Sequence, residues 1–361
     1  AIVFPAVRVA APGPDADRPA AIPMLARGLF AVHARYGGQR PFESLISPAE
    51  QAARFGVPAS RALLRDLAVV AGPLAADPSA RAVFFPGGQP LSEGSTLTQP
   101  DLGASLSQIR TAGVGDLYQG GLARRLEETS RLAGGGLTVD EMRGALPRTG
   151  APLTINAGRD YVAFLPPPAD GGLAAAAAFQ VLQAGGDAGS AQARAMSVAS
   201  RWRQGGGDPM AVLASGGSGG VLPALPASAS FMVLDRTGTT VACVVTMNNL
   251  FGTGRIAPGT GIVLGAAPRP ESAPLLAASI AWNPRLRGFR AAVTGTGQEA
   301  AALAAAVAMN NALKSDQAMP VPVPEPGRAN AIACARYLPD NEGSCNWAPD
   351  PRGAGLAAAG G

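Results

Sequence analysis

The sequence has few of the residues that carry metal or triad chemistry. It contains one histidine, His33, and three cysteines in 361 residues, and charged residues make up only 15% of the chain. The Cys and His spacing fits no zinc pattern, so no metal site is expected. A Ser-His-Asp triad is nearly excluded, because His33 lies in GLFAVHARYG, which has the pattern of an ordinary helix. No apolar run reaches the length of a membrane span.

Basic residues are almost all arginine and are dispersed. The net charge is +4, and Lys314 is the one lysine among 29 Lys and Arg residues. The arginines alternate with acids along predicted helices and form no basic stripe, so nucleic-acid binding is not expected. An excess of Ala, Gly, Pro and Arg with almost no Lys is typical of a GC-rich bacterial genome.

The cysteines indicate an oxidising compartment. Cys334 and Cys345 lie eleven residues apart in a segment rich in Pro, Asn and Gly. We expect them to form a disulfide that contributes about 3 kcal/mol to stability, as in proteins outside the cytoplasm. Cys243 lies in the apolar run VACVV and is expected to be a buried packing residue.

A hairpin is the most informative local pattern. Residues 231–235 and 241–246 are apolar, β-branched runs separated by Arg-Thr-Gly. This pattern predicts two antiparallel strands joined by a short turn. Ser228 precedes the first of these strands. The Gly-rich stretch between residues 205 and 225 leads up to it, and we expect this stretch to be flexible.

The hairpin resembles the start of the small subunit of the γ-glutamyltranspeptidases. Family motifs TTHYSVVD, GNAVA, TxTxN and FGTG correspond without a gap to SASFMVLD, GTTVA, VVTMN and FGTG. Upstream, GDLYQGG is similar to FYxG, GGGLTVDEM to GGxLTxEDL, and PPPADGG to PPPSSGG. The resemblance covers roughly residues 20 to 310 and places Ser228 on the nucleophile, Asp235 on the closing aspartate, Thr246 on the second threonine and Asn248 on the asparagine.

The resemblance implies a self-cleaving N-terminal nucleophile. A hydroxyl without a histidine base needs another proton acceptor, and an α-amine freed at Ser228 has a suitable pKa. Cleavage between Ala227 and Ser228 would free that amine. Thr246 would then hydrogen-bond the hydroxyl or the amine of Ser228 and orient it.

Four further residues take substrate-binding roles from the resemblance. Arg8 faces the arginine of the family's REMAP element, which binds the substrate α-carboxylate through a bidentate fork. Asn248 would donate its amide to the substrate. Gly295 and Gly297, in TGTGQ, match the family's oxyanion motif GSPGGS, and an alanine-rich helix is predicted to begin just after them.

The chain also departs from the family's substrate pocket. Pro270 replaces the acid that holds the α-amino group, with Arg269 beside it. Leu276 and Ala277 replace the two serines that bind the α-carboxylate, and Gln298 replaces the second oxyanion glycine. Three hypotheses stay open: a hydrolase or acyl transferase for γ-glutamyl compounds such as glutathione, an enzyme for a different acyl group, and an uncleaved envelope homologue with a binding or structural role.

The expected fold is a mixed α/β (α+β) domain, the four-layer αββα sandwich of the N-terminal-nucleophile hydrolases. Residues 1–227 would be the large-subunit-like region, helix-rich over 21–150, and 228–318 the small-subunit-like region. Residues 319–361 read as a Pro-rich tail with the disulfide. No signal peptide is recognisable near Ala1, so we expect a removed leader or a shortened N-terminal region.

The expected setting is the periplasm or envelope of a bacterium. The predicted partners are a small amide substrate and, after processing, the two cleaved halves bound to each other. We expect no cofactor and no nucleic acid.

Overall fold

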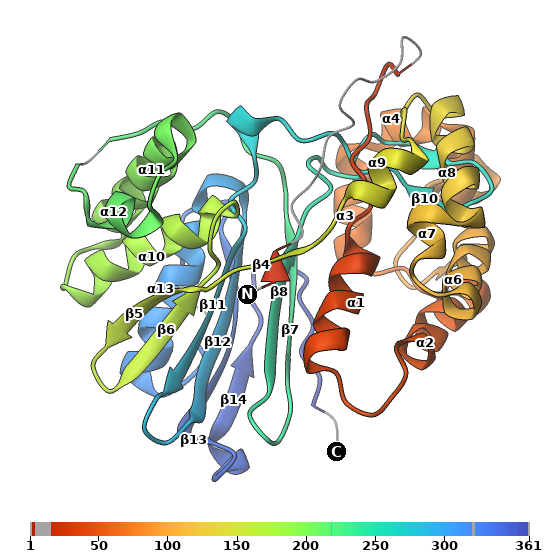
Figure 1. Cartoon of the computed structure of the whole chain (residues 1–361). Helices are drawn as coiled ribbons and strands as arrows, with labels where there is room; N and C mark the ends of the chain where they lie inside the picture. Colours follow the sequence, from red (N-terminus) through yellow and green to blue (C-terminus); the bar gives the residue numbers. More distant parts are fainter. Residues whose placement is uncertain (1, 4–15, 218, 320–321, 360–361) are drawn as a thin grey trace. The chain divides into compact units, whose positions relative to one another are not determined.

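The structure is a computed structural model that describes residues 2–3, 16–217, 219–319 and 322–359. Figure 1 shows the whole chain. It divides into two compact units: unit 1 contains Gly150–Thr246 and Arg269–Gly361, and unit 2 contains Ile2–Thr149 and Met247–Pro268. The units differ from the regions expected from the sequence, because those regions follow the proposed cleavage point and these follow contacts between residues.

Unit 1 is organised around an antiparallel six-stranded sheet with strand order β14-β13-β12-β11-β6-β5. The strands are β5 (Leu153–Ala157), β6 (Asp160–Phe164), β11 (Ala277–Asn283), β12 (Gly288–Thr296), β13 (Arg328–Leu338) and β14 (Cys345–Ala348). Helices α10 (Asp170–Gln183) and α13 (Ala301–Ser315) pack on one face, with α11 (Ala188–Gly205) and the short α12 (Pro209–Ala214) beside them (Figure 1). The facing side chains are mostly alanine, which lets the layers approach closely.

A second, smaller sheet covers the other face of the large one. It is the hairpin of β7 (Ala229–Leu234) and β8 (Thr240–Val245), which contacts β11 and β12. Met232 and Leu234 pack from the hairpin onto a buried cluster that includes Phe289 and Leu338. Unit 1 therefore has a helical layer, a large sheet and a small sheet, which are three successive layers of an αββα sandwich.

Two strands beyond residue 318, β13 and β14, belong to the large sheet of unit 1. The region expected to be a tail supplies β13, which pairs with β12 on one side and β14 on the other. The alternation in RANAIACARYL explains this, since Ala329, Ala331 and Ala333 are buried in the core against the helices. Cys334 and Cys345 lie directly opposite each other on β13 and β14 and are joined by a disulfide.

Unit 2 is mostly helical. Its helices are α1 (Leu25–Tyr36), α2 (Phe42–Phe55), α3 (Arg61–Val69), α4 (Ala71–Ala76), α5 (Pro78–Phe84), α6 (Pro100–Ala112), α7 (Asp116–Gln119), α8 (Gly121–Leu132) and α9 (Val139–Gly144). Its strands are short pairs: β1 (Ile2–Val3) with β4 (Arg148–Thr149), β2 (Val57–Pro58) with β3 (Thr96–Leu97), and β9 (Ile256–Ala257) with β10 (Ile262–Val263). Two buried clusters of Leu, Ala, Ile, Met and aromatic side chains stabilise it.

Candidate active site

The hairpin brings Ser228 and Thr246 together. Ala229, the first residue of β7, pairs with Val245, the last residue of β8. Ser228 and Thr246 are the next residues outward on the two strands, so they face each other at the open end of the hairpin. Ser228 is half-buried. The apolar runs that form the strands therefore set the spacing of the two predicted catalytic residues.

Thr246 contacts the peptide bond that precedes Ser228. Its Oγ1 donates a hydrogen bond to the carbonyl oxygen of Ala227 at 2.7 Å. The sequence predicts a bond from Thr246 to the hydroxyl or amine of Ser228. In the continuous chain the hydroxyl instead binds the carbonyl that Ser228 would attack. A donor on that oxygen draws electrons from the carbonyl carbon and stabilises negative charge that develops on the oxygen.

A group of polar side chains links the hairpin to the large sheet close to Ser228. The hydroxyl oxygens of Ser230 and Thr294 lie 2.9 Å apart, and Asn330 Nδ2 donates to Ser230 Oγ at 3.4 Å. The backbone N–H of Asp350 donates to Asn330 Oδ1. These bonds tie β7 to β12 and β13 two residues from Ser228. This group of polar side chains was not predicted from the sequence, where its signal is the alternation of Ser228 and Ser230 on one strand face.

Gly295 and Gly297 have different structural roles. A side chain at Gly295 would place its Cβ 2.1 Å from the Ala301 carbonyl oxygen, so this glycine lets β12 lie against α13. Gly297 has a φ of +106°, and a Cβ there would lie 2.3 Å from the Pro326 carbonyl oxygen. Gly297 therefore forms a left-handed turn that leads from β12 toward α13.

Asn248 belongs to unit 2. Asn248 Nδ2 donates to the Ala266 carbonyl oxygen at 2.9 Å, and Asn248 has a left-handed φ of 56°. The FGTG motif makes a tight turn in which Gly252 lies against the Leu264 carbonyl. Arg8 lies outside the described residues. The structure therefore brings Ser228 and Thr246 into one site and gives Asn248 a backbone contact within unit 2.

Titratable groups near the hairpin offer no second nucleophile. Burial raises the pKa of the Cys243 thiol to about 11, so it is protonated at neutral pH. Burial acts against ionisation of Asp235, but hydrogen bonds from Thr237 and Thr239 outweigh it and lower the pKa of this carboxyl. Asp235 thus closes the hairpin turn as an anion.

Histidine and metal chemistry find no support in the described part of the chain. His33 lies on α1 of unit 2, where its Nε2 is 2.8 Å from the Arg40 carbonyl oxygen. Across residues 2–3, 16–217, 219–319 and 322–359, no group of three or more His, Cys, Asp or Glu side chains could hold a metal ion. Over the same residues, none of the helices combines the length and the apolar character that crossing a membrane requires.

The fold is that of the N-terminal-nucleophile hydrolases. The cephalosporin acylase from Bacillus halodurans superposes with a TM-score of 0.73 at 17% identity, covering 95% of this chain and 79% of that one. The structure titled LmbA2991HD superposes with a TM-score of 0.67 at 16% identity, covering 93% and 81%. At these identities the likeness establishes the fold alone.

The sequence establishes the family. The family model described as Gamma-glutamyltranspeptidase matches residues 11–210, and the chain belongs to that family. It is 26% identical to glutathione hydrolase 3 of Arabidopsis thaliana over an alignment of 275 residues that covers 66% of this chain and 43% of that protein. It is 31% identical to the glutathione hydrolase proenzyme of Bacillus subtilis (strain 168) over 136 residues, covering 38% and 23%.

An acylase is also among the relatives. The chain is 36% identical over 121 residues to the acylase ACY 1 proenzyme of Pseudomonas sp. (strain SE83), covering 34% of this chain and 21% of that protein. The chain thus spans less than half the length of these three curated relatives.

Proposed function

We propose that this chain is the precursor of an amide hydrolase or acyl transferase that cleaves itself between Ala227 and Ser228. The hydrogen bond from Thr246 Oγ1 to the Ala227 carbonyl oxygen is the observation that supports this most directly. It puts a proton donor on the carbonyl of the one bond whose cleavage would leave Ser228 as an N-terminal residue. Names of relatives that include the word proenzyme agree with such maturation.

Self-cleavage would proceed in two balanced steps. Ser228 Oγ attacks the Ala227 carbonyl carbon and loses its proton, the C–N bond breaks, and the departing nitrogen gains a proton and becomes the α-amine. Water then hydrolyses the resulting ester, which leaves a carboxylate on Ala227 and restores the Ser228 hydroxyl. Thr246 stabilises the oxygen of the carbonyl in the first step.

The mature site would use the new amine as its base. The α-amine accepts the proton of Ser228 Oγ as that oxygen attacks a substrate amide, and it returns a proton to the leaving amine. The acyl group on Ser228 then passes to water or to an acceptor amine. Cleavage frees the Thr246 hydroxyl to orient the nucleophile, and the backbone N–H groups of the Gly297 turn are the candidates for binding the oxyanion.

The two cleaved pieces would remain associated. Residues 1–227 contribute β5 and β6 to the large sheet, and residues 228–361 contribute the other four strands. The junction is the β6–β11 pair, in which four residue pairs run from Ser279↔Phe164 to Trp282↔Tyr161. Helices α10 and α13, one from each piece, also pack together. A backbone nick would therefore leave one sheet and one core shared by both pieces.

The proposed substrates are γ-glutamyl compounds such as glutathione, or amides of a related acyl group. The glutathione hydrolase relatives support the first, and the acylase relative supports a different acyl group. Arg8 and Asn248 would bind the substrate in the first case, and Arg269 in the second. The disulfide supports a setting outside the cytoplasm. Within that setting, the periplasm or envelope of a bacterium is the place proposed from the sequence.

An uncleaved homologue with a binding or structural role at the envelope is the second candidate. The sequence favours it at two positions, since Leu276 and Ala277 stand where the family's substrate pocket has hydroxyl residues. Ala277 is fully buried opposite Gly295 in the sheet and offers no polar group.

Intact-mass spectrometry of the full chain and of Ser228→Ala separates the two candidates. The enzyme proposal expects two pieces that join between Ala227 and Ser228 and whose masses add up to the parent plus one water, with a single uncut chain in the variant. One unbroken chain in both samples would sink the enzyme proposal and support the uncleaved homologue. A panel of γ-glutamyl and other acyl amides would then be tested on the cleaved form.

A further inference from the structure

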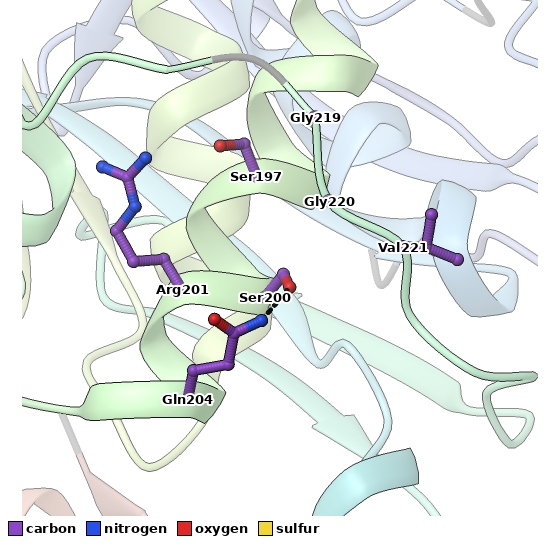
Figure 2. Close-up of a pocket in the computed structure, with 7 residues that line it drawn as sticks. All are labelled: Ser197, Ser200, Arg201, Gln204, Gly219, Gly220 and Val221. Atoms are coloured by element: carbon purple, nitrogen blue, oxygen red, sulfur yellow. Dashed lines mark hydrogen bonds between the residues drawn. The ribbon is translucent and has the colours of Figure 1, made fainter.

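The segment that precedes the cleavage point is fixed to a helix. We call residues 213–217 and 219–227 the lead-in segment. Its Gly-rich sequence predicts a flexible chain, whereas the structure lays it along α11 of unit 1 (Figure 2). A Gly-rich segment loses much conformational entropy when it is ordered, so specific contacts must offset that loss.

Arg194 makes three of these contacts. Its Nη2 donates to the carbonyl oxygens of Leu213 and Ser215, each at 2.7 Å, and its Nη1 donates to that of Gly217 at 3.2 Å. Burial is the main cause that lowers the pKa of Arg194, and the neighbouring charge of Arg201 adds to it. The guanidinium is thus partly removed from water and is compensated by backbone oxygens of the lead-in segment.

Arg201, two turns further along α11, holds the same stretch. Its Nη1 donates to the Gly216 carbonyl oxygen at 2.9 Å and to the hydroxyl of Ser215. Ser215 in turn donates to the Val212 carbonyl oxygen. Arg201 lines a cavity of about 370 Å³ together with Gly219 and Gly220. Figure 2 draws these residues on α11 and on the neighbouring segment.

Apolar contacts continue the attachment toward the cleavage point. A Cβ at Gly220 would lie 2.8 Å from the Met196 carbonyl oxygen, so only glycine can approach α11 this closely. Leu222 packs against the core of unit 1, and Leu225 is buried in it. The carbonyl oxygen of Ala227 then accepts the hydrogen bond from Thr246 Oγ1. The lead-in segment is therefore held at one end by arginines and at the other by the hydroxyl beside Ser228.

We propose that Arg194 and Arg201 are positioning residues for self-cleavage, which keep the lead-in segment on α11 so that the Ala227 carbonyl stays beside Ser228. This inference rests on the proposed function. Without the arginines, the Gly-rich stretch gains freedom, and the Ala227 carbonyl lies beside Thr246 for a smaller share of the time. Small displacements of a reacting group reduce rates by up to about 100-fold.

The test measures the rate of self-cleavage by intact mass after pulse-labelled expression of the full chain. We expect Arg194→Ala/Arg201→Ala to cleave about 10- to 100-fold more slowly than the unmodified chain. Arg201→Lys, which keeps a cationic donor, should recover part of the rate. Gln204→Ala is the matched control: Gln204 lines the same cavity but donates only to Ser200 on its own helix, so its rate should not change.

Thermal unfolding of the same variants in an uncleavable Ser228→Ala chain separates positioning from folding. Slow cleavage with an unchanged folded fraction at the assay temperature supports the proposal. Equal rates in the double variant and the unmodified chain would overturn it while leaving self-cleavage intact, and slowing that appears only where the chain unfolds would overturn it as well. Failure of the unmodified chain to cleave would instead refute the proposed function, and this inference with it.

Discussion

Replacing the hydroxyl of Thr246 by a methyl group tests the proposed chemistry at one atom. Thr246→Val keeps the β-branched shape that suits the end of β8 but removes the donor that lies 2.7 Å from the Ala227 carbonyl oxygen. The strand pairing next to it, Ala229 with Val245, uses backbone groups and is unaffected. The change therefore removes this hydrogen bond and leaves the strand pairing in place.

The expected effect is large because the donor acts where charge develops. Loss of one such preorganised donor typically costs about 100-fold in rate, which corresponds to ~2.7 kcal/mol of activation free energy. We expect the half-time of self-cleavage to lengthen by about this factor, whereas the thermal midpoint should change little. Time-resolved intact mass of freshly synthesised chain measures the first quantity, and circular dichroism measures the second.

Thr246→Ser is the matched control for this prediction. Serine keeps the donor and loses only the methyl group, so its cleavage should stay within a few-fold of the unmodified chain. Thr246→Val cleaving as fast as Thr246→Ser would refute the assignment, since the hydroxyl would then have no part in the step. A second base or donor for the scissile bond would have to be sought.

Three further predictions concern stability. Gly295→Ala should destabilise the fold by about 1–3 kcal/mol or more, because its Cβ closes on the backbone of α13, and urea unfolding would show this even in the uncleavable chain. Arg290→Met should cost about 3–5 kcal/mol of stability in the same assay, since it removes the fully buried cation that faces the buried carboxylate of Asp160. Arg159 also lies near this carboxylate, but its side chain is 64% exposed, so Arg159→Ala should cost under about 1 kcal/mol. Burial acts against ionisation of Asp350, but hydrogen bonds from Arg352 outweigh burial and lower the pKa of this carboxyl. Asp350 therefore contributes stability above the unfolded pKa of 3.8, and this contribution is lost as pH falls through the folded pKa. Acid titration of Asp350→Asn should show a shallower loss of stability below about pH 4, and an unchanged slope would refute the contribution.

Sequence periodicity predicted the local elements of the hairpin and of many helices. The region 21–150, predicted to be helix-rich, contains α1 to α9, and the predicted strands 231–235 and 241–246 differ from β7 and β8 by one or two residues. These elements have a clear period of 3.6 or 2 and end at glycine or at a turn. Their boundaries follow from local chemistry, which a sequence contains.

The elements that sequence reasoning missed depend on distant partners. β13 is rich in alanine, a poor strand former, and becomes a strand because its small side chains fit beneath α13. The contact of the Gly-rich lead-in segment with α11 depends on two arginines in a helix that gave no local sign of that role. Likewise, the Thr246 contact to Ala227 requires the register of the whole hairpin.

The Met247-Asn248 segment that follows Thr246 shows why resemblance alone does not settle activity. Thr246 is the last residue of unit 1 before the chain enters unit 2 at Met247, and the chain returns at Arg269. The backbone N–H of Ala266 donates to the Met247 carbonyl oxygen, and Asn248 donates to the Ala266 carbonyl oxygen, so the outgoing and returning segments are bound together there.

These bonds give Met247 and Asn248 a structural function, which an uncleaved homologue would need as much as an enzyme would. Thr246 and Ser228 differ from Asn248 in this respect. The fold alone does not require the Thr246 hydroxyl, because a backbone N–H group could equally well donate to the Ala227 carbonyl. The discriminating evidence therefore lies in this pair, and mutations at Thr246 bear on function more directly than mutations at Asn248 or in FGTG.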